Sequence, residues 1–118
     1  MQKSSDKGDM ISASAAYRNC DPQRLNDGAY LLSLLRQAAV TTKLNPLSEQ
    51  SHQFEPMGFT GILLLSESHI AIHTWPEKRL AMVDFFTCGG QDPQKALELV
   101  GEGLGSEEIE VRLATFKV

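Results

Sequence analysis

The sequence predicts an α+β fold, a two-layer α/β sandwich in which an antiparallel sheet carries two helices on one face. Two observations carry this prediction. Three strand-like runs follow one another with only short polar connections between them, as in a series of hairpins. Two other segments repeat apolar residues every three or four positions, which is the period of an amphipathic helix. The 118 residues fit one domain with a core that needs neither metals nor disulfides.

The first part of the chain supplies a strand and the longer helix. Residues 1–9 are polar without periodicity, and we expect a flexible N-terminal arm before a single domain of residues 10–118. Residues 10–17 combine small side chains with weak alternation, which favours a first strand. Asp21-Pro22 is typical of a helix N-cap followed by proline in the first turn, so a helix is predicted from about residue 22 to residue 40.

The middle of the chain combines an irregular segment with a three-stranded meander. Asn45-Pro46 separates residues 41–44 from residues 51–54, which predicts an irregular strand or a strand with a loop. The three strands of the meander are expected at residues 58–65, 69–75 and 80–87. The turn between the last two is Pro76-Glu77-Lys78-Arg79.

The C-terminal part supplies the second helix and a last strand. Asp92-Pro93 begins the helix, whose apolar residues recur at helical spacing and which ends near Gly103 and Gly105. Beyond it, apolar residues from Ile109 alternate with charged residues, and this pattern predicts a terminal strand.

Composition favours a small-molecule partner in a reducing compartment. The net charge of −4 argues against a nucleic-acid binder, which needs a basic face. No apolar run reaches the roughly 18 residues that a membrane span needs. The two cysteines, Cys20 and Cys88, follow no hydrophobic signal segment, so we expect a cytoplasmic protein without a disulfide scaffold. The histidines lack the spacing of a zinc site, and no metal is expected.

Polar side chains of three chemical types gather around the meander. Ser66-Glu67-Ser68 connects its first two strands, His73 lies on the second, and Cys88 follows the third. Each has an ordinary structural explanation, since serine and acidic residues are common in hairpin turns and a lone cysteine is usually a buried apolar residue. Neighbouring strands nevertheless allow a serine, a histidine and a cysteine to meet.

The residues Ser-Glu-Ser-His-x-x-x-His-Thr-Trp-Pro-Glu, followed by Val-Asp-x-Phe-Thr-Cys-Gly, resemble the short bacterial and archaeal S-adenosylmethionine decarboxylases from about Cys20 to about Leu99. The resemblance implies decarboxylation of S-adenosylmethionine to the aminopropyl donor of spermidine synthesis. It also implies that the chain cleaves itself between Glu67 and Ser68 into a beta chain, 1–67, and an alpha chain, 68–118. A homodimer is implied too, with two sheets facing each other and active sites near the interface.

The cofactor implied by the resemblance is a pyruvoyl group made from Ser68. Removing carbon dioxide from an amino acid leaves electrons on the α carbon, and no side chain is an adequate electron sink, so a carbonyl cofactor is needed. In the resembled family the serine hydroxyl attacks the preceding carbonyl, and elimination and hydrolysis follow. Thr60 matches the hydroxyl residue that stabilises the oxyanion. His73 matches the residue that removes the α proton, because an imidazole takes up a proton near neutral pH.

Four further residues concern the decarboxylation itself. Cys88 matches the proton donor that returns a proton to the α carbon. Phe54 matches the aromatic residue that stacks on adenine, and Glu77 matches the carboxylate that binds the ribose hydroxyls. Trp75 lines the same region. Without the resemblance, Phe54 and Trp75 are equally well explained as core residues. An aromatic face also attracts a sulfonium cation.

The N-terminal strand departs from the family pattern. Family members begin with a Gly-basic-His-Leu strand, where this chain has Met10-Ile11-Ser12-Ala13, and Ala16 stands where an acidic residue is usual. Two alternatives therefore stay open: a pyruvoyl-dependent ornithine or arginine decarboxylase on the same fold, and a non-catalytic homologue that regulates a true decarboxylase. A thiol hydrolase built on Cys88 and His73 is a third reading, and it leaves the serine-glutamate turn unexplained.

Overall fold

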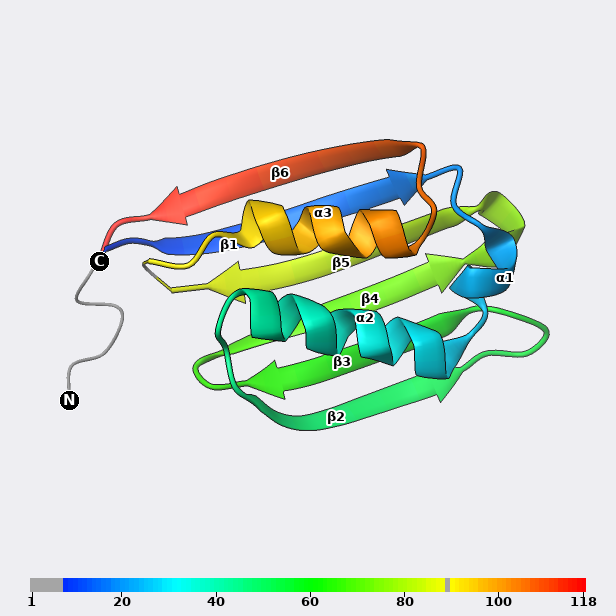
Figure 1. The fold of residues 1–118 in the computed structure, drawn as a ribbon, viewed down its shortest axis with the longest axis horizontal. Coiled ribbons are helices and arrows are strands. Elements are labelled where there is room, and N and C mark those ends of the chain that lie inside the picture. Colours follow the sequence, from blue (N-terminus) through cyan, green and yellow to red (C-terminus); the bar gives the residue numbers. More distant parts are fainter. Residues whose placement is uncertain (1–7, 89) are drawn as a thin grey trace.

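A computed structural model describes residues 8–88 and 90–118 and confirms the predicted α+β sandwich. Six antiparallel strands form one sheet in the order β2-β3-β4-β5-β1-β6. Figure 1 shows α2 and α3 lying side by side over one face of this sheet. Most of the predicted N-terminal arm, residues 1–7, lies outside the described residues.

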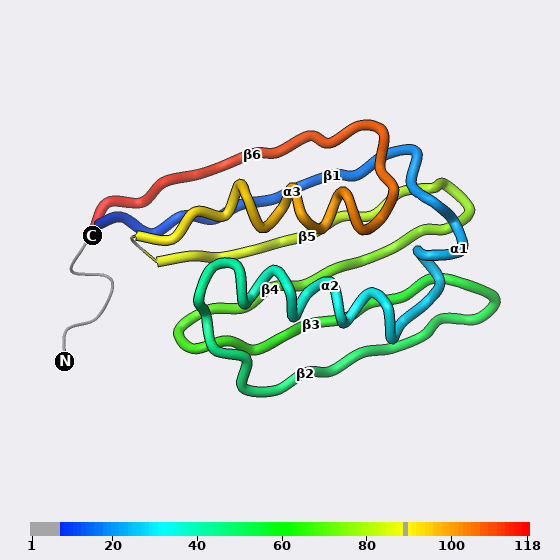
Figure 2. The backbone as a smooth tube through the Cα atoms, in the orientation of Figure 1, coloured from blue at the N-terminus to red at the C-terminus, as the bar shows by residue number. Residues whose placement is uncertain are grey.

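The elements follow one another in the order β1 (Met10–Arg18), α1 (Pro22–Leu25), α2 (Gly28–Thr41), β2 (Pro46–Gln53), β3 (Phe59–Leu65), β4 (Ser68–Trp75), the 3-10 turn η2 (Pro76–Lys78), β5 (Leu80–Thr87), α3 (Pro93–Gly103) and β6 (Glu108–Phe116). Figure 2 traces the backbone through these elements and shows β1 between β5 and β6. The last strand thus pairs with the first strand of the chain.

The helix predicted over residues 22–40 is wrong as one continuous element, because it is interrupted after its first turn. Asp21 caps α1, its carboxylate accepting from the Gln23 N–H at 2.9 Å. Asp27 caps α2 in the same way, accepting from the Tyr30 N–H at 3.1 Å. A second capping aspartate starts a second helix, since the side chain replaces a hydrogen bond that the backbone of a helix start lacks.

β2 is a continuous edge strand, and all of its residues are exposed. It pairs with β3 from Pro46 to Gln53, with a register shift between Pro46 and Ser48. Residues 41–44, which we grouped with this strand, are the end of α2 and a turn. The polar sequence of β2 has no apolar alternation, so its strand conformation depends on pairing with β3.

The hydrophobic core lies between the helices and one face of the sheet. Ile70 and Ile72 of β4 are fully buried, as are Leu31 and Leu35 of α2 and Leu97 of α3. Burying each such side chain contributes about 1.5–3 kcal/mol of transfer free energy. The other face has no helix on it in the part of the chain that is described. Every second residue of β4 points to this face, and His73 and Trp75 are exposed on it.

No helix in the described ranges is long and apolar enough to cross a membrane. The same residues contain no group of three or more potential metal ligands.

Candidate active site

The turn between β3 and β4 holds its second residue in a strained conformation. Glu67 has φ 59°, in the left-handed region that non-glycine residues rarely adopt. Leu65 and Ser68 pair directly across this two-residue turn. Ser68 is 9% exposed, and its hydroxyl donates to the main-chain carbonyl of Phe86 on β5. The peptide bond between Glu67 and Ser68 therefore joins a strained residue to a buried, oriented hydroxyl.

Cys88 lies beside this peptide bond. Its sulfur is 3.9 Å from the main-chain oxygen of Glu67 and 3.9 Å from one oxygen of the Glu67 carboxyl group. The Cys88 N–H donates to the side-chain oxygen of Gln91 at 3.0 Å, which fixes the backbone that carries the thiol. With 2% exposure, the thiol is shielded from bulk water. The structure thus brings together Glu67, Ser68 and Cys88.

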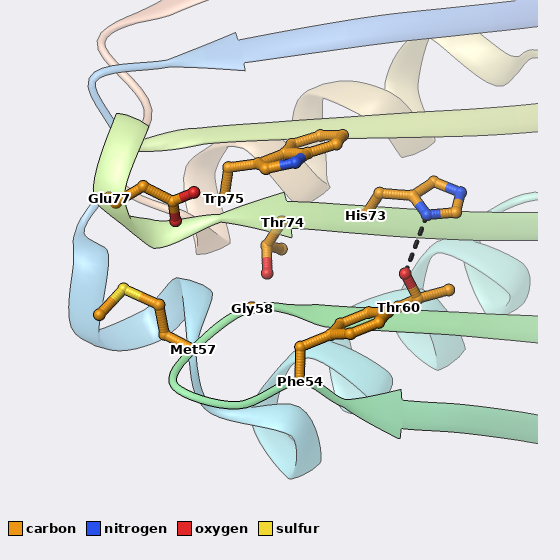
Figure 3. A pocket seen from close by; sticks show the side chains of 8 residues that line it. All are labelled: Phe54, Met57, Gly58, Thr60, His73, Thr74, Trp75 and Glu77. Carbon is orange, nitrogen blue, oxygen red and sulfur yellow. Dashed lines mark hydrogen bonds between the residues drawn. The ribbon is translucent and has the colours of Figure 1, made fainter.

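A second group of predicted residues surrounds a cavity of about 340 Å³ at the other end of β4. Its walls are formed by Phe54, Met57, Gly58, Thr60, His73, Thr74, Trp75 and Glu77. Figure 3 shows Phe54 and Trp75 on opposite sides of the cavity, with Glu77 of η2 at one end. All three predicted substrate-binding residues therefore line one cavity, together with Thr60 and His73.

The Thr60 hydroxyl lies 3.0 Å from Nδ1 of His73. The two residues are direct partners in the β3–β4 ladder, so the sheet itself sets their contact (Figure 3). The rings of His73 and Trp75 are 6.5 Å apart on the same strand face. A hydroxyl, an imidazole and an aromatic face thus form one side of the cavity.

The opposite wall of the cavity depends on Asn26, which the sequence did not indicate. Its side-chain oxygen accepts from the Gly58 N–H at 2.9 Å and from the Gln53 amide at 2.8 Å. The Phe54 N–H closes the loop by donating to the Gly58 carbonyl at 2.8 Å. Gly58 has φ 112°, which L side chains rarely adopt. Asn26 sits in the unforeseen break between α1 and α2, so no sequence pattern pointed to it.

The two groups are separated within one chain. Ser68 and His73 are five residues apart on β4, which is roughly 17 Å along a strand, and this odd spacing turns their side chains to opposite faces. His73 pairs with Met82, six residues before Cys88, so the thiol is roughly 20 Å away. The expectation that serine, histidine and cysteine meet is therefore not met inside a single chain. A Cys88–His73 thiol hydrolase within one chain is excluded by the same distance.

Ala16, the residue that replaces the usual acid, lies opposite Glu110 on β6. Hydrogen bonds from Arg112 and from Arg18 hold the pKa of the Glu110 carboxyl group below its usual range. A second carboxylate at residue 16 would face Glu110 directly, and like charges in such a pair are destabilising. The departure from the family pattern thus coincides with an acidic residue on the neighbouring strand.

Comparison with known proteins gives one consistent result. The family model described as S-adenosylmethionine decarboxylase matches residues 12–115. An S-adenosylmethionine decarboxylase proenzyme of Prochlorococcus marinus (strain MIT 9313) is 47% identical over 75% of this chain and 72% of its own length. A proenzyme of the same description from Thermosipho africanus (strain TCF52B) is 38% identical over 82% and 75%. The crystal structure of the adenosylmethionine decarboxylase from Aquifex aeolicus VF5 superposes with a TM-score of 0.83 at 31% identity, covering 95% of this chain and 93% of that one.

Proposed function

The chain belongs to the S-adenosylmethionine decarboxylase family, and we propose that it is a proenzyme that cleaves itself between Glu67 and Ser68 before decarboxylating S-adenosylmethionine. The observation that supports this most is the thiol of Cys88, 3.9 Å from the carbonyl oxygen of Glu67. The turn carries the bond to be cleaved and the nucleophile, and the proposed proton donor lies beside it at the end of β5. The product would be an aminopropyl donor for polyamine synthesis.

Self-cleavage begins with the Ser68 hydroxyl. Its oxygen attacks the Glu67 carbonyl carbon, the C–N bond breaks, and the hydroxyl proton ends on the nitrogen of residue 68. The left-handed conformation of Glu67 costs free energy of order 1–3 kcal/mol, and opening the turn releases it. Removal of the Ser68 α proton then expels the new Glu67 carboxylate. Water replaces the nitrogen, which leaves as ammonia.

The residues around position 68 fit the pyruvoyl group that this sequence of steps leaves there. The fit rests on a buried hydroxyl after a strained residue and on a thiol directly beside the bond. A pyruvoyl group supplies the electron-accepting carbonyl that decarboxylation needs. Cys88 holds a proton next to this position and can return it to the α carbon of the product. A reactive free thiol suits a reducing compartment, so we place the protein in the cytoplasm.

The cavity suits an adenosyl group. Phe54 and Trp75 offer two aromatic faces to a purine base or a sulfonium, and Glu77 offers an acceptor for two ribose hydroxyls. Ornithine and arginine have neither a base nor a ribose. A site that pairs with ribose hydroxyls binds a ligand without them less well, so the cavity would discriminate against these smaller amino acids. The relatives' names also favour S-adenosylmethionine over the ornithine and arginine alternatives and over a non-catalytic homologue.

A homodimer would complete the site. Each chain carries Ser68 and Cys88 at one end of β4 and His73 with Thr60 at the other, roughly 17 Å away. On the uncovered sheet face, Ile62 is 39% exposed and Leu64 is 51% exposed. A second copy facing this surface covers apolar side chains and brings the His73 end of one chain to the Ser68 end of its partner.

Two measurements test the proposed function together. Intact-mass analysis should find a chain of residues 1–67 and a chain of residues 68–118 with a blocked N-terminus. Carbon dioxide release should then be measured from S-adenosylmethionine, ornithine, arginine and lysine offered side by side. A tenfold higher kcat/KM for ornithine or arginine, about 1.4 kcal/mol, would overturn the adenosyl reading of the cavity. A single full-length mass in active protein would overturn self-cleavage.

A further inference from the structure

One buried hydroxyl next to the cleavage site has no hydrogen-bond partner. Among the described residues, the Thr87 side-chain oxygen is the one fully buried side-chain N or O atom without a partner. Thr87 itself is 0% exposed. Buried polar atoms are nearly always hydrogen-bonded, because an unpaired one costs folding free energy, and an exception in a native fold calls for an explanation. A valine of nearly the same shape would avoid this cost, so the hydroxyl has no packing role that requires it.

The sheet places this hydroxyl beside the residue that is to react. Thr87 is the last residue of β5, and Ser68 is the first residue of β4. The residues next to them, Phe86 and His69, are paired across the two strands. Continuing that register sets Thr87 opposite Ser68, and directly opposed side chains lie on the same face about 4.5–5.5 Å apart between Cβ atoms.

The other neighbours in this row of the sheet offer no polar side chain. On β1, Thr87 pairs with Ile11, and on β3, Ser68 pairs with Leu65. Ser68 already donates its own proton to the Phe86 carbonyl and not to Thr87. Within this row, the nearest polar neighbour of the Thr87 hydroxyl is therefore residue 68. In the uncleaved chain the Thr87 hydroxyl makes no hydrogen bond.

We propose that the Thr87 hydroxyl is the hydrogen-bond donor that this chain supplies to the oxygens of the Glu67–Ser68 linkage during self-cleavage. The proposal rests on the self-cleavage proposed above. When the Ser68 oxygen adds to the Glu67 carbonyl carbon, the carbonyl oxygen gains negative charge. When the Cβ–O bond of residue 68 later breaks, its electron pair leaves with the new Glu67 carboxylate. A donor held in a buried site beside these oxygens stabilises both states.

Thr60 cannot take this part within the same chain. It pairs with His73, whereas Ser68 pairs with Leu65, so Thr60 is five residues from the turn along β3, or roughly 17 Å. Thr60 reaches the linkage only from a partner copy. Thr87 is the hydroxyl that each chain can contribute to its own cleavage.

The test compares Thr87→Val with Thr87→Ser. The chains are made by cell-free translation, and intact mass follows the conversion of the 118-residue precursor with time. Thr87→Val keeps the shape and removes the donor, so cleavage should slow by roughly 100- to 1,000-fold, the effect of losing an oxyanion donor. Thr87→Ser keeps the donor and should cleave within about threefold of wild type.

Thermal unfolding distinguishes a catalytic hydroxyl from a structural one. If the Thr87 hydroxyl stabilised the fold, Thr87→Val would lower the Tm. Measured on Ser68→Ala chains, which cannot cleave, Thr87→Val should leave the Tm unchanged or raise it, because an unpaired buried donor is removed. Thr42→Val is the matched control, since the buried Thr42 hydroxyl donates to the carbonyls of Ala38 and Ala39 at 3.1 and 3.0 Å. It should lower the Tm and leave the cleavage rate unchanged.

Equal cleavage rates for Thr87→Val and wild type would overturn the role of Thr87 and leave the proposed function intact. A Thr87→Val chain that is both slow and less stable, with Thr87→Ser equally slow, would also overturn it, because the hydroxyl would then be structural. A wild-type chain that never cleaves would overturn self-cleavage itself, and the role of Thr87 with it.

Discussion

The Cys88 sulfur lies 3.9 Å from the main-chain oxygen of Glu67, at the bond where self-cleavage is proposed. If this thiol returns the proton to the product, Cys88→Ala should lower kcat by roughly 100-fold or more and change KM little. Intact mass must first show that the variant has been cleaved. Cys20→Ala is the matched control, since Cys20 is also buried, but its thiol donates to the Tyr17 carbonyl at 3.4 Å and not to the Glu67–Ser68 bond. A similar loss of kcat in both variants would contradict the assignment.

Separation of Ser68 and His73 along β4 predicts complementation between inactive chains. Ser68→Ala alone cannot cleave, and His73→Ala alone should cleave poorly because no imidazole removes the α proton. In a mixed dimer, the Ser68→Ala chain supplies His73 to the intact Ser68 of the His73→Ala chain. One of the two sites in that dimer is then complete, so at most about half of the wild-type activity per dimer is restored. Co-expression followed by intact mass and carbon dioxide release measures this.

The control mixture combines Ser68→Ala with Cys88→Ala. Both residues belong to the same end of the chain, so no site in the mixed dimer has both, and decarboxylation should stay at the level of the single variants. Recovery of activity in this control, or none in the first mixture, would contradict a site shared between two chains.

Glu77 sits at the end of the cavity and is expected to act on binding alone. Glu77→Ala should raise KM for S-adenosylmethionine about 10- to 100-fold, the effect of losing charged hydrogen bonds of about 1.5–3 kcal/mol, while kcat changes little. Glu98→Ala removes an exposed carboxylate on α3, away from the cavity, and should leave both constants unchanged. A fall in kcat with constant KM for Glu77→Ala would show that the carboxylate takes part in the chemistry.

Tyr17 links the first strand to α3, because its hydroxyl donates to the Leu97 carbonyl at 2.7 Å. Tyr17→Phe should lower the free energy of unfolding by about 1–2 kcal/mol at pH 7, measured by urea unfolding of Ser68→Ala chains. Tyr30→Phe is the control for losing one hydrogen bond of the same length, from Tyr30 to Gly103.

Burial raises the pKa of the Tyr17 hydroxyl, and the nearby Cys20 raises it further. The folded chain therefore holds this proton more tightly than the unfolded chain. Its contribution to stability is complete below about pH 10, the ordinary tyrosine pKa, and is lost as the pH rises beyond that value. Above about pH 10, the free energy of unfolding of Tyr17→Phe should therefore fall less steeply with pH than that of the parent chain. Equal slopes of the free energy of unfolding against pH would contradict this.

Most of the fold could be predicted from local pattern. Alternation from residue 69 to residue 75 and in Leu80–Thr87 reports directly which side of a strand is buried, and both strands were placed within a residue. From the sequence, β2 was predicted only as an irregular strand or a strand with a loop, because the conformation of PLSEQSHQ depends on its partner strand. The break before α2 was missed because the apolar spacing continues across it, whereas the Asp27 cap is a single polar contact.

The site was predicted as a set of residues but not as an arrangement. The family resemblance named Ser68, Cys88 and five of the eight residues that line the cavity, and the structure places each beside others of that set. Spacing along the sequence did not show that Ser68 and His73 face opposite sides of the sheet, although period-two alternation over five residues implies it. Thr87 was overlooked as well, because an unpaired donor is visible only when its surroundings are known.

The order of the strands decides what self-cleavage does to the molecule. Residues 1–67 carry β1, β2 and β3, and residues 68–118 carry β4, β5 and β6, yet β1 lies between β5 and β6. Three ladders, β3–β4, β1–β5 and β1–β6, therefore join the two fragments. The proposed cut would release neither piece, because these ladders would still hold the two fragments in one sheet. Unfolding of the cleaved protein would then include dissociation of the fragments, so its thermal stability should depend on protein concentration. Refolding would require two separate chains to meet, and dilution should therefore slow it.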